Sequence, residues 1–301
     1  NQLPSDSDEG RHVASNIFEF KMREQLKNSD FVVLYRTNAQ SRAIEDALRK
    51  REIAYKIYGG LSFYQRKEIK DVMAYLRLVI NNKDEESLKR IINYPARGIG
   101  QTTINKLIVA SKKYNITLFD TIKKAKEINL NINHGTASKL ENFVILIERF
   151  QIENELLDAF EITDLIIKKI GILTELKNDA TPENISRIEN IEELLNGIRD
   201  FTEGQKELSD ASGNLGEFLE DVALITDLDN KNDDNSDKVS LMTIHLAKGL
   251  EFPYVFIVGL EEDLFPSALS LNTRGELEEE RRLFYVALTR AKKRAFLSYT
   301  I

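Results

Sequence analysis

The sequence predicts an α/β fold, in which a parallel-sheet domain is split along the chain by a large helical insertion. Near the N-terminus, short apolar segments typical of buried strands alternate with helical segments. From about residue 84 to residue 237, apolar residues recur at three- and four-residue spacing, as in amphipathic helices. Strand-like segments then resume at Val239. The β-α-β-α order at the start predicts parallel strands joined by right-handed crossovers.

The N-terminal elements follow from apolar spacing and from end signals. Residues 1 to about 12 are polar without a period and are expected to form a tail or linker. Thr37 or Asn38 offers an N-cap for a helix that runs through Arg51, and the Gly-Gly pair at 59–60 ends a strand. The expected elements are a helix at 13–26, a strand at 31–35, a helix at 38–51, a strand at 54–58 and a helix at 67–80.

The domain organisation follows from where the helical pattern begins and ends. We expect the first part of the sheet domain at 1–84, the helical insertion at 85–236 and the second part of the sheet domain at 237–301. The acidic, Asn-rich stretch 226–238 is expected to be a surface loop. Breaks between the inserted helices are expected at 129–135, 178–182 and 209–213.

The composition limits the classes of function. The 301 residues are enough for two domains, and the absence of cysteine excludes disulfides and Cys-ligated metal. With only 3 histidines, no metal site is expected. The net charge of -7 argues against nucleic-acid binding over the whole surface, but not against a local basic groove. No apolar run approaches the length of a membrane span, and the sequence begins with Asn1 rather than with Met. We therefore expect a piece of a longer cytoplasmic protein.

Two segments near the C-terminus carry the clearest chemical signal, Val239–Phe252 and Glu278–Lys292. An apolar strand candidate, Tyr254–Gly259, runs between them. The segments predict a strand, a polar loop, a second strand and then a helix that presents arginines. Open α/β sheets bind ligands where strands end in polar loops, and an arginine there can reach a transferring phosphoryl group. Taken singly, His245 could be an ordinary loop histidine and Arg290 a solvated helix arginine.

These segments resemble motifs V and VI of superfamily 1 DNA helicases of the UvrD/PcrA/Rep type. The matching patterns are Thr-x-His-x-x-Lys-Gly-Leu-Glu-Phe and Glu-Arg-Arg-Leu-x-Tyr-Val-Ala-x-Thr-Arg-Ala. The resemblance implies that the sheet domain is a RecA-like motor domain, called 2A, and that the helical insertion is the domain called 2B. It also implies a helicase that unwinds duplex DNA in the 3′ to 5′ direction with ATP and Mg²⁺.

The segment Phe31–Arg42 ends a strand and opens a helix. Tyr35 offers a ring for base stacking, and Arg36 offers a cation for phosphate. Spacing alone favours the alternative, in which Tyr35 packs in the sheet and Arg36 pairs with an acid. The segment is similar to helicase motif IV, Tyr-Arg-Thr-Asn-Ala-Gln-Ser-Arg, and this similarity favours the nucleotide-binding interpretation.

The resemblance implies a role for each matching residue. Arg36 and Arg290 would be catalytic and reach the γ-phosphate, Tyr35 would stack on adenine, and Glu251 would accept a hydrogen bond from the ribose. The expected cofactor-binding residues are Tyr35, Arg36, Gly249, Glu251 and Arg290. Thr243 and His245 would lie beside single-stranded DNA.

Two further segments have glycines next to aromatic or basic residues. Tyr58–Tyr64 resembles motif IVa, and its Phe63 and Tyr64 could stack on bases or lie in the core. The segment Pro95–Lys106 resembles a helix-hairpin-helix element, in which Gly-Ile-Gly before a helix frees N–H groups for duplex phosphates. The alternative is an ordinary helix–helix turn. The expected DNA-binding residues here are Gly98, Gly100, Thr102 and Lys106, with added positive charge from Arg97.

The chain has no Gly-x-x-x-x-Gly-Lys-[Ser/Thr] loop, which cradles phosphates and positions Mg²⁺. We therefore expect the C-terminal half of a helicase, inactive alone, whose Mg²⁺ ligands lie in a missing N-terminal motor half. The expected partners are single-stranded and duplex DNA and that half, with no membrane. The expected setting is DNA repair in a bacterial cytoplasm, on the nucleoid. The alternatives are a stand-alone duplex-DNA or protein docking module, and part of a recombination helicase–nuclease subunit.

Overall fold

The computed structural model describes residues 1–128, 130–179, 181–207, 213–229, 237–267 and 273–300. The chain divides into two compact units, which are described separately below. Unit 1 consists of Asn1–Arg66 and Ala223–Ile301, and unit 2 consists of Lys67–Val222.

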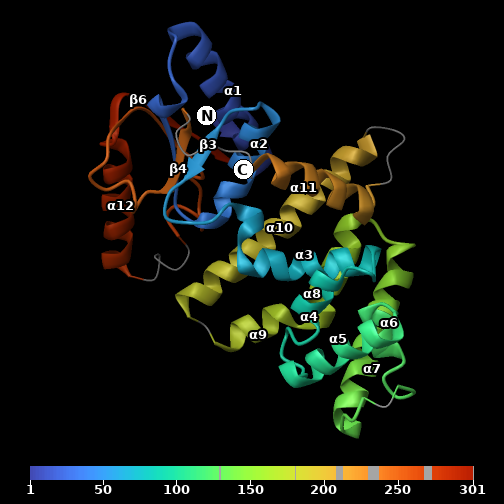
Figure 1. Ribbon diagram of the computed structural model, residues 1–301. Helices are drawn as coiled ribbons and strands as arrows, with labels where there is room; N and C mark the ends of the chain where they lie inside the picture. The colour runs from blue at the N-terminus through green and yellow to red at the C-terminus, as the bar shows by residue number, and fades with distance from the viewer. Residues whose placement is uncertain (129, 180, 208–212, 230–236, 268–272, 301) are drawn as a thin grey trace. The chain divides into compact units, whose positions relative to one another are not determined.

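Unit 1 is built on a five-stranded parallel sheet (Figure 1). Its strands are β2 (Phe31–Tyr35), β3 (Tyr55–Ile57), β4 (Val239–Thr243), β5 (Phe252–Ile257) and β6 (Ala291–Leu297). Their order in the sheet is β3-β4-β2-β5-β6, and every neighbouring pair is parallel. Strands from both sides of the helical segment therefore share one sheet, which confirms the predicted fold class.

Helices cover both faces of this sheet, since alternate residues of a strand point to opposite sides. Helices α1 (Asp6–Glu24) and α2 (Ser41–Lys50) pack on one face, in a core that includes Ile17, Ile44 and Val33. Helix α12 (Arg274–Leu288) packs on the other face, where Leu283 lies in the same core as Leu34. Short 3₁₀ turns η1 (Asn28–Asp30), η2 (Asn38–Gln40) and η3 (Phe63–Gln65) complete the unit's first part.

The prediction of a tail or linker at residues 1–12 is wrong. Strand β1 (Gln2–Leu3) pairs in parallel with β7 (Tyr299–Thr300), and α1 already begins at Asp6. Ser5 caps this helix, because its Oγ accepts the N–H of Asp8 at 3.2 Å. The acidic first turn of α1 also complements the positive end of the helix dipole.

The helix expected to present the arginines of the segment Glu278–Lys292 ends before Arg290 in the structure. Helix α12 ends at Leu288, and β6 follows as an edge strand that the sequence pattern did not reveal. The N–H of Phe252 donates to the carbonyl oxygen of Arg290 at 2.9 Å, which starts the pairing with β5. Arg290 therefore lies in the turn between α12 and β6.

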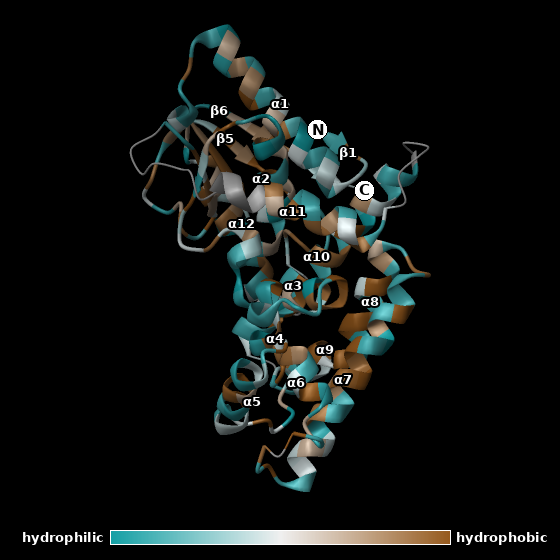
Figure 2. Ribbon diagram, turned by 45° about the vertical axis from the view of Figure 1, so that its right-hand side comes forward, coloured by the Kyte–Doolittle hydropathy of each residue, from teal (hydrophilic) through white to brown (hydrophobic). Residues whose placement is uncertain are grey.

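Unit 2 consists of helices in the residues that the structure describes, as the periodicity predicted. They are α3 (Lys67–Ile80), α4 (Glu85–Ile91), α5 (Gln101–Tyr114), α6 (Leu118–Lys123), α7 (His134–Asn154), α8 (Ala159–Ile170), α9 (Ile172–Asn178), α10 (Pro182–Glu207) and the start of α11 (Leu215–Asp229). Figure 2 shows hydrophobic residues gathered along α7, α8 and α9. No helix in the described part of the chain is long and apolar enough to cross a membrane.

The boundaries of the two units differ from the expected domain boundaries at residues 84 and 236. Helix α3 belongs to unit 2, because it packs against α4, α7 and α10. Helix α11 extends to Asp229, into the stretch 226–238 that was expected to be an acidic loop. Residues 230–236 of that stretch, and most of the expected break at 209–213, lie outside the described residues.

Candidate functional site

The carboxyl edge of the sheet in unit 1 brings several expected site residues together. Arg36 follows β2, Thr243 ends β4, and His245 comes two residues later. Strands β2 and β4 are neighbours, with Tyr35 in register with Thr243. The polar loops of these two strands therefore lie side by side, where ligands bind open parallel sheets.

Arg36 is held by a residue that the sequence interpretation did not single out. Its Nε donates to both carboxylate oxygens of Glu280 at 3.1 Å, and its Nη2 donates to Oε1 at 2.8 Å. The Arg36 side chain is 21% exposed and that of Glu280 is 7% exposed. The spacing of Glu280 from Leu283 and Ala287 places all three on the buried face of α12, and this spacing could have identified Glu280 as a buried acid.

The turn after β2 is fixed by Gln40. Its Oε1 accepts the N–H of Arg36 at 2.8 Å and the N–H of Thr37 at 3.0 Å. These bonds hold the backbone where the strand gives way to η2, as a capping side chain does. Gln40 thus fixes the backbone conformation at Arg36, independently of the contact between the Arg36 side chain and Glu280.

Tyr35 does not offer the expected stacking face in this conformation. The residue is 1% exposed and packs in the same core as Ile44 and Val33. Burial raises the pKa of its hydroxyl, and the negative charge of Glu45 adds to that effect. The structure thus agrees with the interpretation that spacing alone favoured, with Tyr35 in the sheet and Arg36 paired to an acid.

His245 is exposed on the loop after β4 and lies within the electrostatic field of Arg36 and Glu280. Partial desolvation of the ring, followed by the positive charge of Arg36, holds the pKa of His245 below its ordinary value of 6.5. Glu280 opposes this effect. A neutral imidazole is therefore favoured near neutral pH, and it can both donate and accept a hydrogen bond.

Arg290 lies in the turn between α12 and β6, just before a strand, whereas Arg36 lies just after one. Its Nη1 donates to the carbonyl oxygen of Leu250 at 2.9 Å, and its Nε donates to that of Val286 at 3.0 Å. Its Nη2 donates to the hydroxyl of Thr289 at 3.0 Å. The convergence of Arg36 and Arg290 on one phosphate stays a prediction.

The residues before β5 are open to solvent. Gly249 has φ of +87° and nothing within 4 Å of where a Cβ would lie, so a ligand could approach its backbone closely. Glu251 is exposed and forms a surface ion pair with Lys292, at 3.7 Å between Oε2 and Nζ. Glu251 is therefore accessible to a ligand hydroxyl.

Phe63 and Tyr64 of the motif IVa segment are buried, whereas Tyr58 is 43% exposed. Phe63 is 0% and Tyr64 is 7% exposed, so base stacking is excluded for both in this conformation. The loop is anchored by the buried carboxylate of Glu45, which accepts the Ser62 hydroxyl at 2.8 Å and Arg49 Nη2 at 2.9 Å. Burial raises the pKa of Glu45, and the charge of Arg49 opposes that effect.

In unit 2, the expected DNA-binding residues surround the start of α5. Gly98 has φ of +70°, and Gly100 is the N-cap residue, with open space around the position of a Cβ. Thr102 is exposed in the first turn. Lys139 was missed by the sequence interpretation: its Nζ lies 2.6 Å from where a Cβ on Gly98 would be. The turn therefore combines open backbone with a cation from α7.

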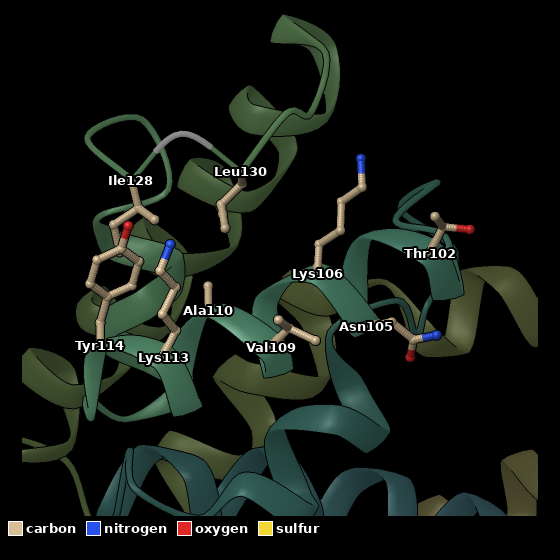
Figure 3. A pocket seen from close by; sticks show the side chains of 9 residues that line it. All are labelled: Thr102, Asn105, Lys106, Val109, Ala110, Lys113, Tyr114, Ile128 and Leu130. Carbon is tan, nitrogen blue, oxygen red and sulfur yellow. The ribbon is translucent and has the colours of Figure 1, made fainter.

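A groove of about 410 Å³ is lined by α5 together with Ile128 and Leu130 (Figure 3). Val109 is 66% exposed and Tyr114 is 48% exposed, and both line it. Lys106 also lines the groove, and its Nζ donates to the carbonyl oxygen of Asn131 at 2.6 Å. In Figure 3 the Lys106 side chain extends away from the helix, near Thr102.

Arg97 was expected to add positive charge, but its donors are directed into the turn. Its Nη1 donates to the carbonyl oxygens of Ile91 at 2.9 Å, Tyr94 at 3.0 Å and Pro95 at 3.3 Å, and its Nη2 donates to the hydroxyl of Tyr75. Its guanidinium carbon also lies 5.8 Å from the centroid of the Tyr75 ring. The side chain holds the turn together from inside.

Comparison with known proteins gives the family. The family model described as UvrD-like helicase C-terminal domain matches residues 2–301. The chain is 40% identical over 297 residues to the ATP-dependent DNA helicase PcrA of Staphylococcus aureus (strain MRSA252), covering 98% of this chain and 40% of that protein. It is 41% identical over 295 residues to PcrA of Bacillus subtilis (strain 168), covering 96% and 39%. For PcrA of Leuconostoc citreum the identity is 38% over 295 residues, covering 98% and 39%.

The chain thus spans about two-fifths of the length of these relatives. The match extends over both units, and it includes the strand ends and the turn described above. The chain belongs to the UvrD-like helicase C-terminal domain family.

Proposed function

We propose that the chain is the C-terminal half of an ATP-dependent 3′ to 5′ DNA helicase that unwinds duplex DNA. The observation that carries the proposal is the edge of the parallel sheet at which Arg36, Thr243 and His245 meet, in a chain that matches the helicase family over residues 2–301. The relatives are named ATP-dependent DNA helicases, which supports the use of ATP.

Unit 1 would supply positive charge to the nucleotide from its side of a cleft. Arg36 would stabilise charge that develops on the γ-phosphate, and Arg290 would join it by leaving the carbonyl oxygens that it now contacts. Gly249 and Glu251 would contact the sugar end of the nucleotide. The chain has no phosphate-cradling loop, so we propose that the N-terminal motor half supplies that loop and the Mg²⁺ ligands.

DNA contacts would come from both units. Thr243 and His245 would lie beside single-stranded DNA, since they share a sheet edge with Arg36. In unit 2, Gly98, Gly100 and Thr102 would present backbone N–H groups at the start of α5 to duplex phosphates. We assign the chain to DNA repair or replication in the bacterial cytoplasm on the same family grounds.

The test is the full-length helicase carrying Arg36→Ala or Arg290→Ala. Each change should lower DNA-stimulated ATP turnover about 100- to 1,000-fold, because each removes a charge from the transition state. Arg282→Ala is the matched control, since Arg282 is 69% exposed on α12 and pairs only with Glu279 at the surface among the described residues. Wild-type turnover in both test variants, or turnover by the isolated chain that Arg290→Ala abolishes, would contradict the proposal.

A further inference from the structure

We propose that Glu280 is the positioning residue for Arg36. Its carboxylate holds one edge of the guanidinium group and leaves the other edge for the terminal phosphate of a nucleoside triphosphate. This inference rests on the proposed function, which assigns Arg36 to that phosphate.

The hydrogen bonds around Arg36 occupy one edge of a planar group. A guanidinium has five N–H donors in a rigid fork, and Nε with Nη2 forms one edge of it. Both Glu280 oxygens bind this edge, at 2.8 to 3.1 Å. Nη1 donates to no atom among the residues that the structure describes, and the side chain keeps 21% of its surface exposed. The edge formed by Nη1 and Nη2 therefore remains for a phosphate.

Glu280 is a fixed acceptor, unlike the acids beside it. The residue is 5% exposed and lies on the buried stripe of α12 with Leu283 and Ala287. The N–H of Ser267 also donates toward its Oε2, at 3.4 Å. Because solvent screens a buried pair only weakly, the contact with Arg36 resists salt and restrains the rotation of both side chains.

The neighbouring Glu279 shows what an ordinary acid on this helix does. It is 64% exposed and pairs with Arg282, which is 69% exposed, at 3.0 Å. Such surface pairs contribute little, since both side chains lose entropy and water screens the charges. Two adjacent glutamates on one helix thus pair with arginines in opposite environments, and only Glu280 can orient its partner.

Orientation matters because an arginine stabilises developing charge only when its donors already point at it. The Arg36 side chain has several rotatable bonds, and without Glu280 it would sample many rotamers. Its contact with the γ-phosphate would then form in only a fraction of the bound complexes. The effect depends on the γ-phosphate, so it should appear with ATP and be absent with ADP.

The test compares Glu280→Gln and Glu280→Ala with Glu279→Gln in the full-length helicase. Glu280→Gln keeps the side-chain volume but places an amide NH₂ against the arginine. We expect kcat for ATP hydrolysis to fall about 10- to 100-fold, and affinity for a non-hydrolysable ATP analogue to fall about fivefold. ADP affinity should not change in either variant, and Glu279→Gln should match the wild type in all three measurements.

Other outcomes separate this inference from the proposed function. Arg36→Ala with wild-type turnover would overturn the proposed function itself. If Arg36→Ala impairs ATP turnover but Glu280→Gln has the same turnover as Glu279→Gln, only the positioning role is overturned. Tighter binding of the ATP analogue would show that Glu280 competes with phosphate, and weaker binding of both nucleotides would show a general structural role. Either result overturns the inference.

A second measurement needs no variant that might fail to fold. In the wild-type protein, the Nε proton of Arg36 should exchange with water at least tenfold more slowly than that of Arg282, because both Glu280 oxygens accept it. Equal exchange rates, measured by NMR, would overturn the inference.

Discussion

Arg36 in unit 1 and Arg97 in unit 2 differ in how their hydrogen-bond donors are used. Arg36 lies in the segment that resembles helicase motif IV and Arg97 in the segment that resembles a helix-hairpin-helix element, and both were expected to supply positive charge. Arg36 contacts one carboxylate with one edge. Arg97 contacts three carbonyl oxygens and the hydroxyl of Tyr75. A motif can therefore place an arginine near a ligand, but only the structure shows whether its donors are available.

The largest expected effect that tests this comparison is on the stability of unit 2. Arg97→Ala should lower the free energy of unfolding by about 3 kcal/mol, because it removes the hydrogen bonds from one side chain to three carbonyl oxygens and to the Tyr75 hydroxyl. Urea unfolding followed by circular dichroism measures this change. Lys106→Ala, in the same segment, should change stability by less than about 0.5 kcal/mol. An unchanged free energy of unfolding in Arg97→Ala would mean that the internal contacts of Arg97 are weak.

A smaller effect is expected on duplex binding by the full-length helicase. Lys106→Ala should weaken binding about threefold and reduce the slope of log K against log salt by about 1, since one phosphate contact is lost. Lys177→Ala is the control, because Lys177 is exposed on α9 and outside the expected DNA-binding residues. Binding titrations at several salt concentrations measure both values. An unchanged slope for Lys106→Ala would remove this lysine from the duplex contacts.

The smallest expected effect concerns His245. Arg36→Gln removes a positive charge and should raise the pKa of His245 toward 6.5, whereas Glu280→Gln should lower it further. NMR titration of the 3 histidines measures this pKa, with Arg282→Gln as the control. Because folding lowers this pKa, the stabilising contribution of the neutral ring is present above pH 6.5 and is lost as pH falls through the folded value. A shift in the opposite direction would show that Arg36 and His245 are not coupled.

The sequence predicted much of the fold because apolar periodicity reports burial directly. It predicted the parallel sheet, the helical segment and most helix positions. It did not predict β1 and β7, which have only two residues each, or β6, most of whose residues are exposed and which therefore lacks the apolar pattern of a buried strand. The sequence pattern also did not predict the first part of α1, from Asp6 to His12, because charged residues predominate there and give no apolar periodicity.

The candidate site was less predictable, because motif positions do not define side-chain partners. The resemblance identified Arg36 and Arg290 as arginines of the motifs, but not that Glu280 contacts the first and the carbonyl oxygen of Leu250 the second. Tyr35 was expected at a ligand and lies in the core. These contacts join residues far apart in the chain, and local spacing carries no information about them.

The position of β4 in the sheet has a consequence for the order of folding. Strand β4 lies between β2 and β3, yet it follows them in the chain after the whole of unit 2. During synthesis β2 and β3 therefore emerge long before the strand that joins them, and each has an edge without its partner. Closing this long-range pairing costs loop entropy and slows folding. On the ribosome, unit 1 can complete its sheet only after unit 2 has been made.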